Sequence, residues 1–171
     1  LAKSSVFIGT SSHIILIIMP EAKQKNTSSI LVVDDDPSIR LLIRKSLEEA
    51  DFNVEEAPEG NCALQMLEDH KPDLVLLDLC MPGLGVFETC QAIRQIPDLK
   101  SVPIMIITGM NDPDSILHAF KVGANDFITK PINFLLLLPR VQNLLHHSNT
   151  MKDLRASEER LRQVLQNMPV M

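Results

Sequence analysis

The stretch Ile30-Leu31-Val32-Val33-Asp34-Asp35-Asp36 decides the fold, because a short apolar run ends there in a cluster of acids. Three further apolar runs also stop at a chemically useful residue, namely Asp78, Thr108 and Lys130. Apolar runs of this length are typical of parallel strands that are buried on both faces. Ligands bind at the carboxyl ends of such strands in an open α/β sheet, so we expect these four ends to form one site.

Helical stretches separate the apolar runs. The expected strands cover residues 30–34, 53–57, 73–78, 103–108 and 126–129, and the expected helices cover 37–50, 58–70, 86–96, 112–123 and 132–147. Asp36 before Pro37 is typical of a helix start. Pro139 lies inside the last helical run, where we expect a kink or a delayed helix start. The alternation predicts a doubly wound five-stranded parallel sheet of the α/β class, without fixing the order of its strands.

The composition limits the classes of function. The chain of 171 residues fits one domain with appendages, and its hydrophobic fraction of 45% is enough to fill a core. The net charge of −6 argues against a dedicated nucleic-acid binder. Cys62, Cys80 and Cys90 lack the spacing of a zinc site or a disulfide framework, so we expect free thiols in a cytoplasmic protein. No apolar segment reaches the roughly 20 residues that cross a bilayer, so we expect no membrane contact.

We expect residues 1–28 to form a disordered or leader segment. Met19-Pro20-Glu21 opens a polar stretch that resembles a translation start, whereas the chain itself begins with Leu1. We therefore interpret residues 1–18 as translated upstream sequence or an added leader.

The expected strand ends bring together carboxylates, one hydroxyl and one amine, which are the groups needed to bind a divalent metal and a phosphoryl group. Five marks of one family stand in order along the chain, and they are Asp34-Asp35, Asp78, Met81-Pro82, Thr108-Gly109 and Lys130-Pro131. Together they resemble the receiver domain of bacterial two-component response regulators over residues 29–147. The resemblance implies a flavodoxin-like fold and a phosphorelay partner, either a histidine kinase or a phosphotransfer protein.

The roles of these residues follow from the chemistry of phosphoryl transfer, which needs charge neutralisation and positioning. Asp35 and Asp78 can supply oxygen ligands to Mg²⁺, and Asp34 would join them through water. Asp78 would be the nucleophile that becomes an aspartyl phosphate. Lys130 would pair with one phosphoryl oxygen, and the Thr108 hydroxyl would hydrogen-bond another. The resemblance adds the backbone carbonyl of Cys80 as a metal ligand.

The resemblance also implies a conformational switch and a cis peptide bond between Lys130 and Pro131. Phe127 stands where receivers carry an aromatic residue that changes rotamer on phosphorylation, and Thr108 would be its switching partner. Val86 departs from the pattern, because receivers usually have a glycine two residues before the acidic start of the next helix, often as Asp-Gly, and this chain has Gly85-Val86 in register with that pair. A β-branched residue resists a positive φ, so we expect an altered loop path beside Asp78.

The chain continues beyond the expected receiver in a seven-residue pattern. Its apolar members are Leu144, Met151, Leu154, Leu161, Leu165 and Met168. The pattern predicts a linker helix in the region 148–171 and a parallel coiled-coil homodimer through residues 144–168. The alternative is an amphipathic helix folded onto its own domain. Residues 157–169 resemble the lead-in helix of PAS sensory domains, so we expect a downstream output module that this sequence lacks.

Two other functions remain open from the sequence. A Mg²⁺-dependent phosphohydrolase would also use an aspartate at a strand end, but it usually has a second acid two residues later, where this chain has Cys80. A degenerate receiver would only mediate protein contacts. The intact acids and Lys130 argue against that alternative, and Val86 favours it. We expect a signalling switch rather than an enzyme.

Overall fold

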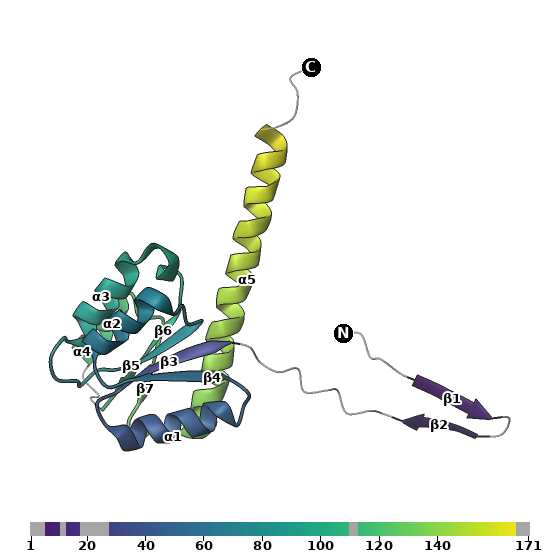
Figure 1. Ribbon diagram of the computed structural model, residues 1–171, viewed down its shortest axis with the longest axis horizontal. Coiled ribbons are helices and arrows are strands. Elements are labelled where there is room, and N and C mark those ends of the chain that lie inside the picture. Colours follow the sequence, from purple (N-terminus) through teal and green to yellow (C-terminus); the bar gives the residue numbers. More distant parts are fainter. Residues whose placement is uncertain (1–5, 11–12, 18–27, 110–112, 167–171) are drawn as a thin grey trace.

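Five parallel strands form the central sheet of the computed structural model, in the order β4-β3-β5-β6-β7 (Figure 1). The structure describes residues 6–10, 13–17, 28–109 and 113–166. The strands of this sheet are β3 (Ser29–Val33), β4 (Asn53–Ala57), β5 (Leu74–Asp78), β6 (Ile104–Thr108) and β7 (Asp126–Thr129). The helices are α1 (Pro37–Glu48), α2 (Gly60–Asp69), α3 (Val86–Gln95), α4 (Pro113–Lys121) and α5 (Phe134–Gln166), with a short 3₁₀ helix, η1 (Pro97–Leu99). The doubly wound α/β prediction is confirmed.

Helices cover both faces of the sheet (Figure 1). Side chains alternate along each strand, so Leu31 and Val33 of β3 enter one core while Ile30 and Val32 enter the other. The first core packs against α2, α3 and α4, and the second packs against α1 and α5. Because β5 and β6 are buried on both faces, their sequences are apolar throughout up to the last residue.

The predicted element boundaries differ from the observed ones by a few residues. Strand β3 ends at Val33, so Asp34 lies just beyond it, and α2 begins at Gly60 instead of Pro58. Asp36 caps α1 as predicted, because its Oδ1 accepts hydrogen bonds from the backbone N–H of Ser38 at 2.7 Å and of Ile39 at 3.4 Å. This cap fixes the turn that carries the acidic cluster.

Within the segment 1–28, the structure contains two antiparallel strands, β1 (Val6–Thr10) and β2 (His13–Ile17). Residues 1–5 and 18–27 lie outside the described residues. The interpretation of this segment as a disordered or leader sequence stays a prediction.

The loop before α3 corrects our expectation for Val86. The positive φ in this loop belongs to Gly83, at +83°, and Gly85 is extended at −64°. Val86 is the first residue of α3, and its side chain is buried in the core against α2 and α4. The β-branched side chain therefore meets no backbone strain, because the residue that turns the loop is a glycine three positions earlier.

Helix α5 extends well beyond the sheet (Figure 1). It begins at Phe134, where Asn133 Oδ1 accepts a hydrogen bond from Leu135 N at 3.0 Å, and it runs through Pro139 to Gln166. A delayed start at Pro139 is therefore wrong. Apolar contacts of the buried side chains Leu137 and Val141 with the sheet hold the helix around the proline, which lacks one N–H donor.

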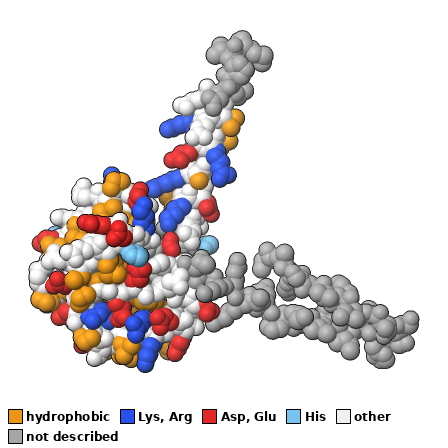
Figure 2. Space-filling model, viewed as in Figure 1, with side chains coloured by type: hydrophobic (Ala, Val, Ile, Leu, Met, Phe, Trp, Pro, Cys, Tyr) orange, Lys and Arg blue, Asp and Glu red, His pale blue; other side chains and the backbone are white. Residues whose placement is uncertain are grey.

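The last part of α5 projects away from the sheet (Figures 1 and 2). Every residue from 151 to 166 is exposed. The alternative in which this helix folds onto its own domain is therefore wrong, and the predicted helix beyond His147 is confirmed up to Gln166. Met168 lies outside the described residues.

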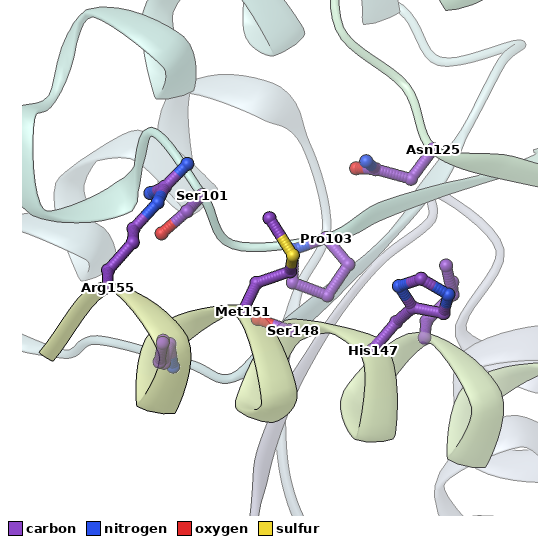
Figure 3. A pocket seen from close by; sticks show the side chains of 9 residues that line it. Ser101, Pro103, Asn125, His147, Ser148, Met151 and Arg155 are labelled. Carbon is purple, nitrogen blue, oxygen red and sulfur yellow. The ribbon is translucent and has the colours of Figure 1, made fainter. Parts of the chain in front are cut away.

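A hollow of about 330 Å³ marks the place where α5 leaves the sheet (Figure 3). Met151, Lys152 and Arg155 of α5 line one side of it. Pro103 and Asn125, which immediately precede β6 and β7, line the other side. These residues lie at the amino ends of the strands, so the hollow is at the opposite end of the sheet from the acidic cluster. In the part of the chain that the structure describes, no helix is long and apolar enough to cross a membrane.

Candidate functional site

Three carboxylates meet at the carboxyl ends of two neighbouring strands. Strand β3 pairs directly with β5, so Asp34 and Asp35, which follow β3, lie beside Asp78 at the end of β5. One oxygen from each of the three side chains can be chosen so that all lie within 4.8 Å of one another. Asp34 and Asp78 are buried, whereas Asp35 is exposed. The site is therefore open to solvent on the side of Asp35.

Lys130 reaches this cluster from the end of β7. Its Nζ lies 2.8 Å from Asp34 Oδ2 and 3.0 Å from Asp78 Oδ1. The backbone of Lys130 is held against β6, because its N–H donates a hydrogen bond to the carbonyl oxygen of Thr108 at 2.7 Å. The peptide bond between Lys130 and Pro131 is cis, as the family resemblance implied. One ammonium group thus bridges two buried carboxylates.

The pKa values of the cluster reflect its burial and charge. Burial raises the pKa of Asp78, and the negative charge of Asp34 adds to that effect, while Lys130 and the backbone N–H of Cys80 partly oppose it. For Lys130, burial alone would lower the pKa, but contacts with Asp34 and Asp78 outweigh burial and raise it. The lysine therefore stays charged, and Asp78 carries a charge that the site only partly compensates.

The donor set fits a magnesium ion. Carboxylate oxygens are ligands that Mg²⁺ prefers, and it usually keeps several waters besides one or two carboxylates. Oδ1 of Asp78 is buried and accepts no hydrogen bond, although the ammonium of Lys130 lies at ion-pair distance. Because the single ammonium of Lys130 is shared between Asp34 and Asp78, the three clustered carboxylates leave a need for a further cation. Asp34, Asp35 and Asp78 could hold such an ion.

The remaining predicted residues lie around this cluster. Thr108 is buried at the end of β6, next to β5 in the sheet. Phe127 of β7 is partly buried, and its ring meets the ring of Phe120 edge-on with centroids 6.1 Å apart. All three cysteines are free thiols: Cys80 is exposed, Cys62 is partly buried and Cys90 is buried. The metal-ligand role of the Cys80 carbonyl and the switch role of Thr108 and Phe127 stay predictions.

Sequence reasoning missed Arg40, which also contacts this site. Its Nη1 donates to the backbone carbonyl of Asp34 at 2.6 Å. The sequence gives only a weak indication of this role, because a polar residue such as Arg40 in an amphipathic helix is expected on the solvent-exposed face. Only the structure shows that its side chain turns back toward the end of β3.

The fold and the site together define a receiver domain of two-component signalling. The chain belongs to the response regulator receiver domain family, whose model matches residues 30–142. Members of this family are signalling switches and not enzymes in the usual sense. The predicted resemblance is confirmed.

Relatives of the chain include response regulators and a sensor kinase. The response regulator PleD of Caulobacter vibrioides is 35% identical over 133 residues, which is 77% of this chain and 29% of PleD. The sensor kinase/phosphatase CqsS of Vibrio cholerae is 37% identical over 125 residues, or 72% of this chain and 18% of CqsS. The chain thus spans under a third of either protein.

Solved structures agree with this result. The chemotaxis response regulator CheY4 of Vibrio cholerae superposes with a TM-score of 0.67 at 31% identity. The match covers 70% of this chain and 99% of the CheY4 chain. The match therefore takes in nearly the whole CheY4 chain.

Proposed function

We propose that this chain is a phosphoacceptor receiver in a His-to-Asp phosphorelay, with Asp78 as the residue that is phosphorylated. The observation that supports this most is the placement of Asp78: it is buried, it carries a raised pKa, and Lys130 pairs with it at 3.0 Å. Asp78 ends β5, where it shares the Lys130 ammonium with Asp34 and clusters with the carboxylates of Asp34 and Asp35. A carboxylate in that position can act as a nucleophile toward phosphorus.

The proposed reaction transfers a phosphoryl group between two side chains. A carboxylate oxygen of Asp78 attacks the phosphorus of a phosphohistidine on the partner, the bond between phosphorus and nitrogen breaks, and the imidazole leaves with the electron pair and takes up a proton. Lys130 stabilises one phosphoryl oxygen, and the Thr108 hydroxyl donates to another. Attack of water on the same phosphorus later breaks its bond to Asp78 and releases inorganic phosphate.

Mg²⁺, when bound, would neutralise the negative charge that develops on the phosphoryl oxygens. Asp34, Asp35 and Asp78 would hold it, with the backbone carbonyl of Cys80 as a further ligand. Asp78 would have a double role, because one of its oxygens would bind the metal while the other attacks phosphorus.

The partners follow from this reaction. A histidine kinase or a phosphotransfer protein would donate the phosphoryl group, and phosphorylation would shift Thr108 and Phe127 between two packings. The signal would pass along α5 to an output module in the full-length protein, within the cytoplasm. The exposed seven-residue pattern of residues 144–168 would pair two copies of the chain. No nucleic acid is required for this function.

The alternatives are less well supported. A receiver that only mediates contacts was favoured by Val86, but that residue begins α3 without backbone strain. A phosphohydrolase would need a second acid near Asp78, where the sequence has Leu79 and Cys80.

Mg²⁺ binding tests the proposal independently of phosphorylation. Isothermal titration calorimetry on the metal-free protein should give one Mg²⁺ per chain. Asp35→Asn should weaken the binding by about tenfold or more, because it removes a charged ligand. Asp36→Asn is the matched control, since Asp36 caps α1 and is not in the cluster. If the parent protein binds no Mg²⁺, or if both variants lose it equally, the proposal is wrong.

A further inference from the structure

We infer that Arg40 is a positioning residue that aims the carboxylate of Asp35 into the proposed magnesium site. This inference rests on the proposed function. Arg40 lies on α1, and its side chain is only 16% exposed. Its Nη1 donates a hydrogen bond of 2.6 Å to the backbone carbonyl of Asp34, which lies six residues earlier in the sequence. A charged donor makes this bond stronger than one between neutral groups.

The other polar groups of Asp34 are also held. Its backbone N donates to Ala57 O at 3.3 Å, which continues the pairing of β3 with β4. Its Oδ1 accepts from Asp36 N at 2.9 Å, and its Oδ2 accepts from Lys130 Nζ at 2.8 Å. The carbonyl oxygen is the remaining polar atom, and Arg40 is the residue that binds it. Asp34 is therefore fixed by β4, by the start of α1 and by Lys130 together.

This fixation matters chiefly for the next residue. The peptide bond between Asp34 and Asp35 is planar, so fixing the carbonyl of Asp34 also fixes the N–H and the Cα of Asp35. The side chain of Asp35 is exposed, so packing around it does little to restrict its direction. The orientation of its backbone therefore decides whether its carboxylate points at Asp34 and Asp78. In the structure it does, because the three acids form one cluster.

A second carboxylate holds Arg40 in place. Glu56 of β4 lies with its Oε1 3.7 Å from Arg40 Nε, and its Oε2 accepts a hydrogen bond of 2.6 Å from Arg44 Nη1. Arg44 thus anchors Glu56, and Glu56 steadies the guanidinium of Arg40. Arg44 pairs with Glu48 and Glu56 and reaches Arg40 only through Glu56, so Arg44→Met, one turn away on the same helix and with the same loss of charge, should have only a smaller, indirect effect.

Loss of Arg40 should weaken metal binding without changing the chemistry at Asp78. Changes in residues that orient metal ligands typically cost 10- to 100-fold in affinity. We expect Arg40→Met to raise the Mg²⁺ dissociation constant by about tenfold, at the lower end of that range. The phosphorylation rate with acetyl phosphate should fall at low Mg²⁺ and stay within about twofold of the parent rate at saturating Mg²⁺. Arg40→Lys should restore part of the affinity, because its ammonium can also donate to the carbonyl.

The experiment is a Mg²⁺ titration by calorimetry on the parent, Arg40→Met, Arg40→Lys and Arg44→Met. Hydrogen exchange of the Asp36 amide in the metal-free proteins provides a readout that needs no magnesium, because this amide donates to the fixed Asp34 side chain. We expect clearly faster exchange in Arg40→Met and exchange close to that of the parent in Arg44→Met, which loosens Arg40 only through Glu56. If Arg40→Met does not fold, Glu56→Gln should show a smaller loss of affinity in the same direction.

Two results would overturn the role of Arg40. One is parent-like Mg²⁺ affinity and amide exchange in folded Arg40→Met. The other is an equal loss of affinity in Arg44→Met, which would indicate a general effect of charge. A parent protein that binds no Mg²⁺ would refute the proposed function instead. In that case, slower exchange of the Asp36 amide in the parent than in Arg40→Met would still show that Arg40 positions the turn.

Discussion

At the residue scale, burial of Asp78 imposes an electrostatic cost on its charged form. Its pKa is raised by burial first and by the charge of Asp34 second. The folded domain is therefore stabilised when this carboxylate is protonated or replaced by a neutral side chain. In metal-free buffer at neutral pH, Asp78→Asn should therefore increase the free energy of unfolding, by about 1 kcal/mol, the size of a typical single substitution. Urea unfolding followed by circular dichroism measures this.

The pH dependence of that difference has a definite sign. Because the pKa of Asp78 is higher in the folded than in the unfolded chain, protonation stabilises the fold, fully below the unfolded pKa of 3.8. This contribution is lost as pH rises through the folded pKa. The stability advantage of Asp78→Asn should thus grow from acidic to neutral pH, and an advantage that shrinks with rising pH would contradict the raised pKa.

The cysteines provide a second test at the residue scale. Burial raises the pKa of the Cys90 thiol to about 11, whereas Cys80 is exposed. Because the thiolate is the reactive form, a thiol reagent at neutral pH should modify Cys80 first and should reach Cys90 only after unfolding. Peptide mass spectrometry after timed labelling identifies the site. Early labelling of Cys90 in the folded protein would show that α3 is not packed as described.

Residues at strand ends could be predicted from sequence, and residues that act on backbone atoms could not. Asp34, Asp78 and Lys130 each follow an apolar run, and the sheet then brings them together. Arg40 escaped prediction because its partner is a carbonyl, which leaves no mark in the sequence. Val86 was misjudged because the turn depends on the φ of Gly83.

At the scale of elements, Arg94 fastens α3 to the amino ends of β6 and β7. Its guanidinium donates to the carbonyl oxygens of Leu99, Val102 and Gly123. Arg94→Met would leave these acceptors without their donor, and we expect a loss of about 2–4 kcal/mol in unfolding free energy. Arg94→Lys keeps the charge but not the planar fork, so it should recover only part of the loss. Parent-like urea unfolding of Arg94→Met would disprove this role.

Helix α5 shows how far a periodic pattern can be trusted. The spacing of Leu144, Met151 and Leu154 predicts a helix beyond the receiver, and the structure contains it. The predicted delay of the helix start to Pro139 was wrong, because apolar contacts with the sheet outweigh the loss of the backbone N–H donor that proline lacks. The strand order β4-β3-β5-β6-β7 was not readable from periodicity, which describes single elements and not their neighbours.

At the scale of the whole molecule, the exposed seam of α5 predicts pairing of two chains. Leu154 is 52% exposed and Leu161 is 63% exposed, at seven-residue spacing. Two copies would bury both. Leu154→Glu combined with Leu161→Glu should convert a dimer into a monomer in sedimentation velocity, because charges would then lie in the seam. Ala156→Glu is the control, since it lies outside the seam. A parent protein that is monomeric, with and without phosphorylation, would contradict pairing through α5.

The central claim is that Asp78 accepts a phosphoryl group, and intact mass spectrometry tests it most directly. The protein is incubated with Mg²⁺ and acetyl phosphate, beside Asp78→Asn and the helix-cap control Asp36→Asn. We predict one added phosphoryl group on the parent and on Asp36→Asn, and none on Asp78→Asn. Addition to Asp78→Asn at the parent level, or no addition to a parent that binds Mg²⁺, would contradict the account.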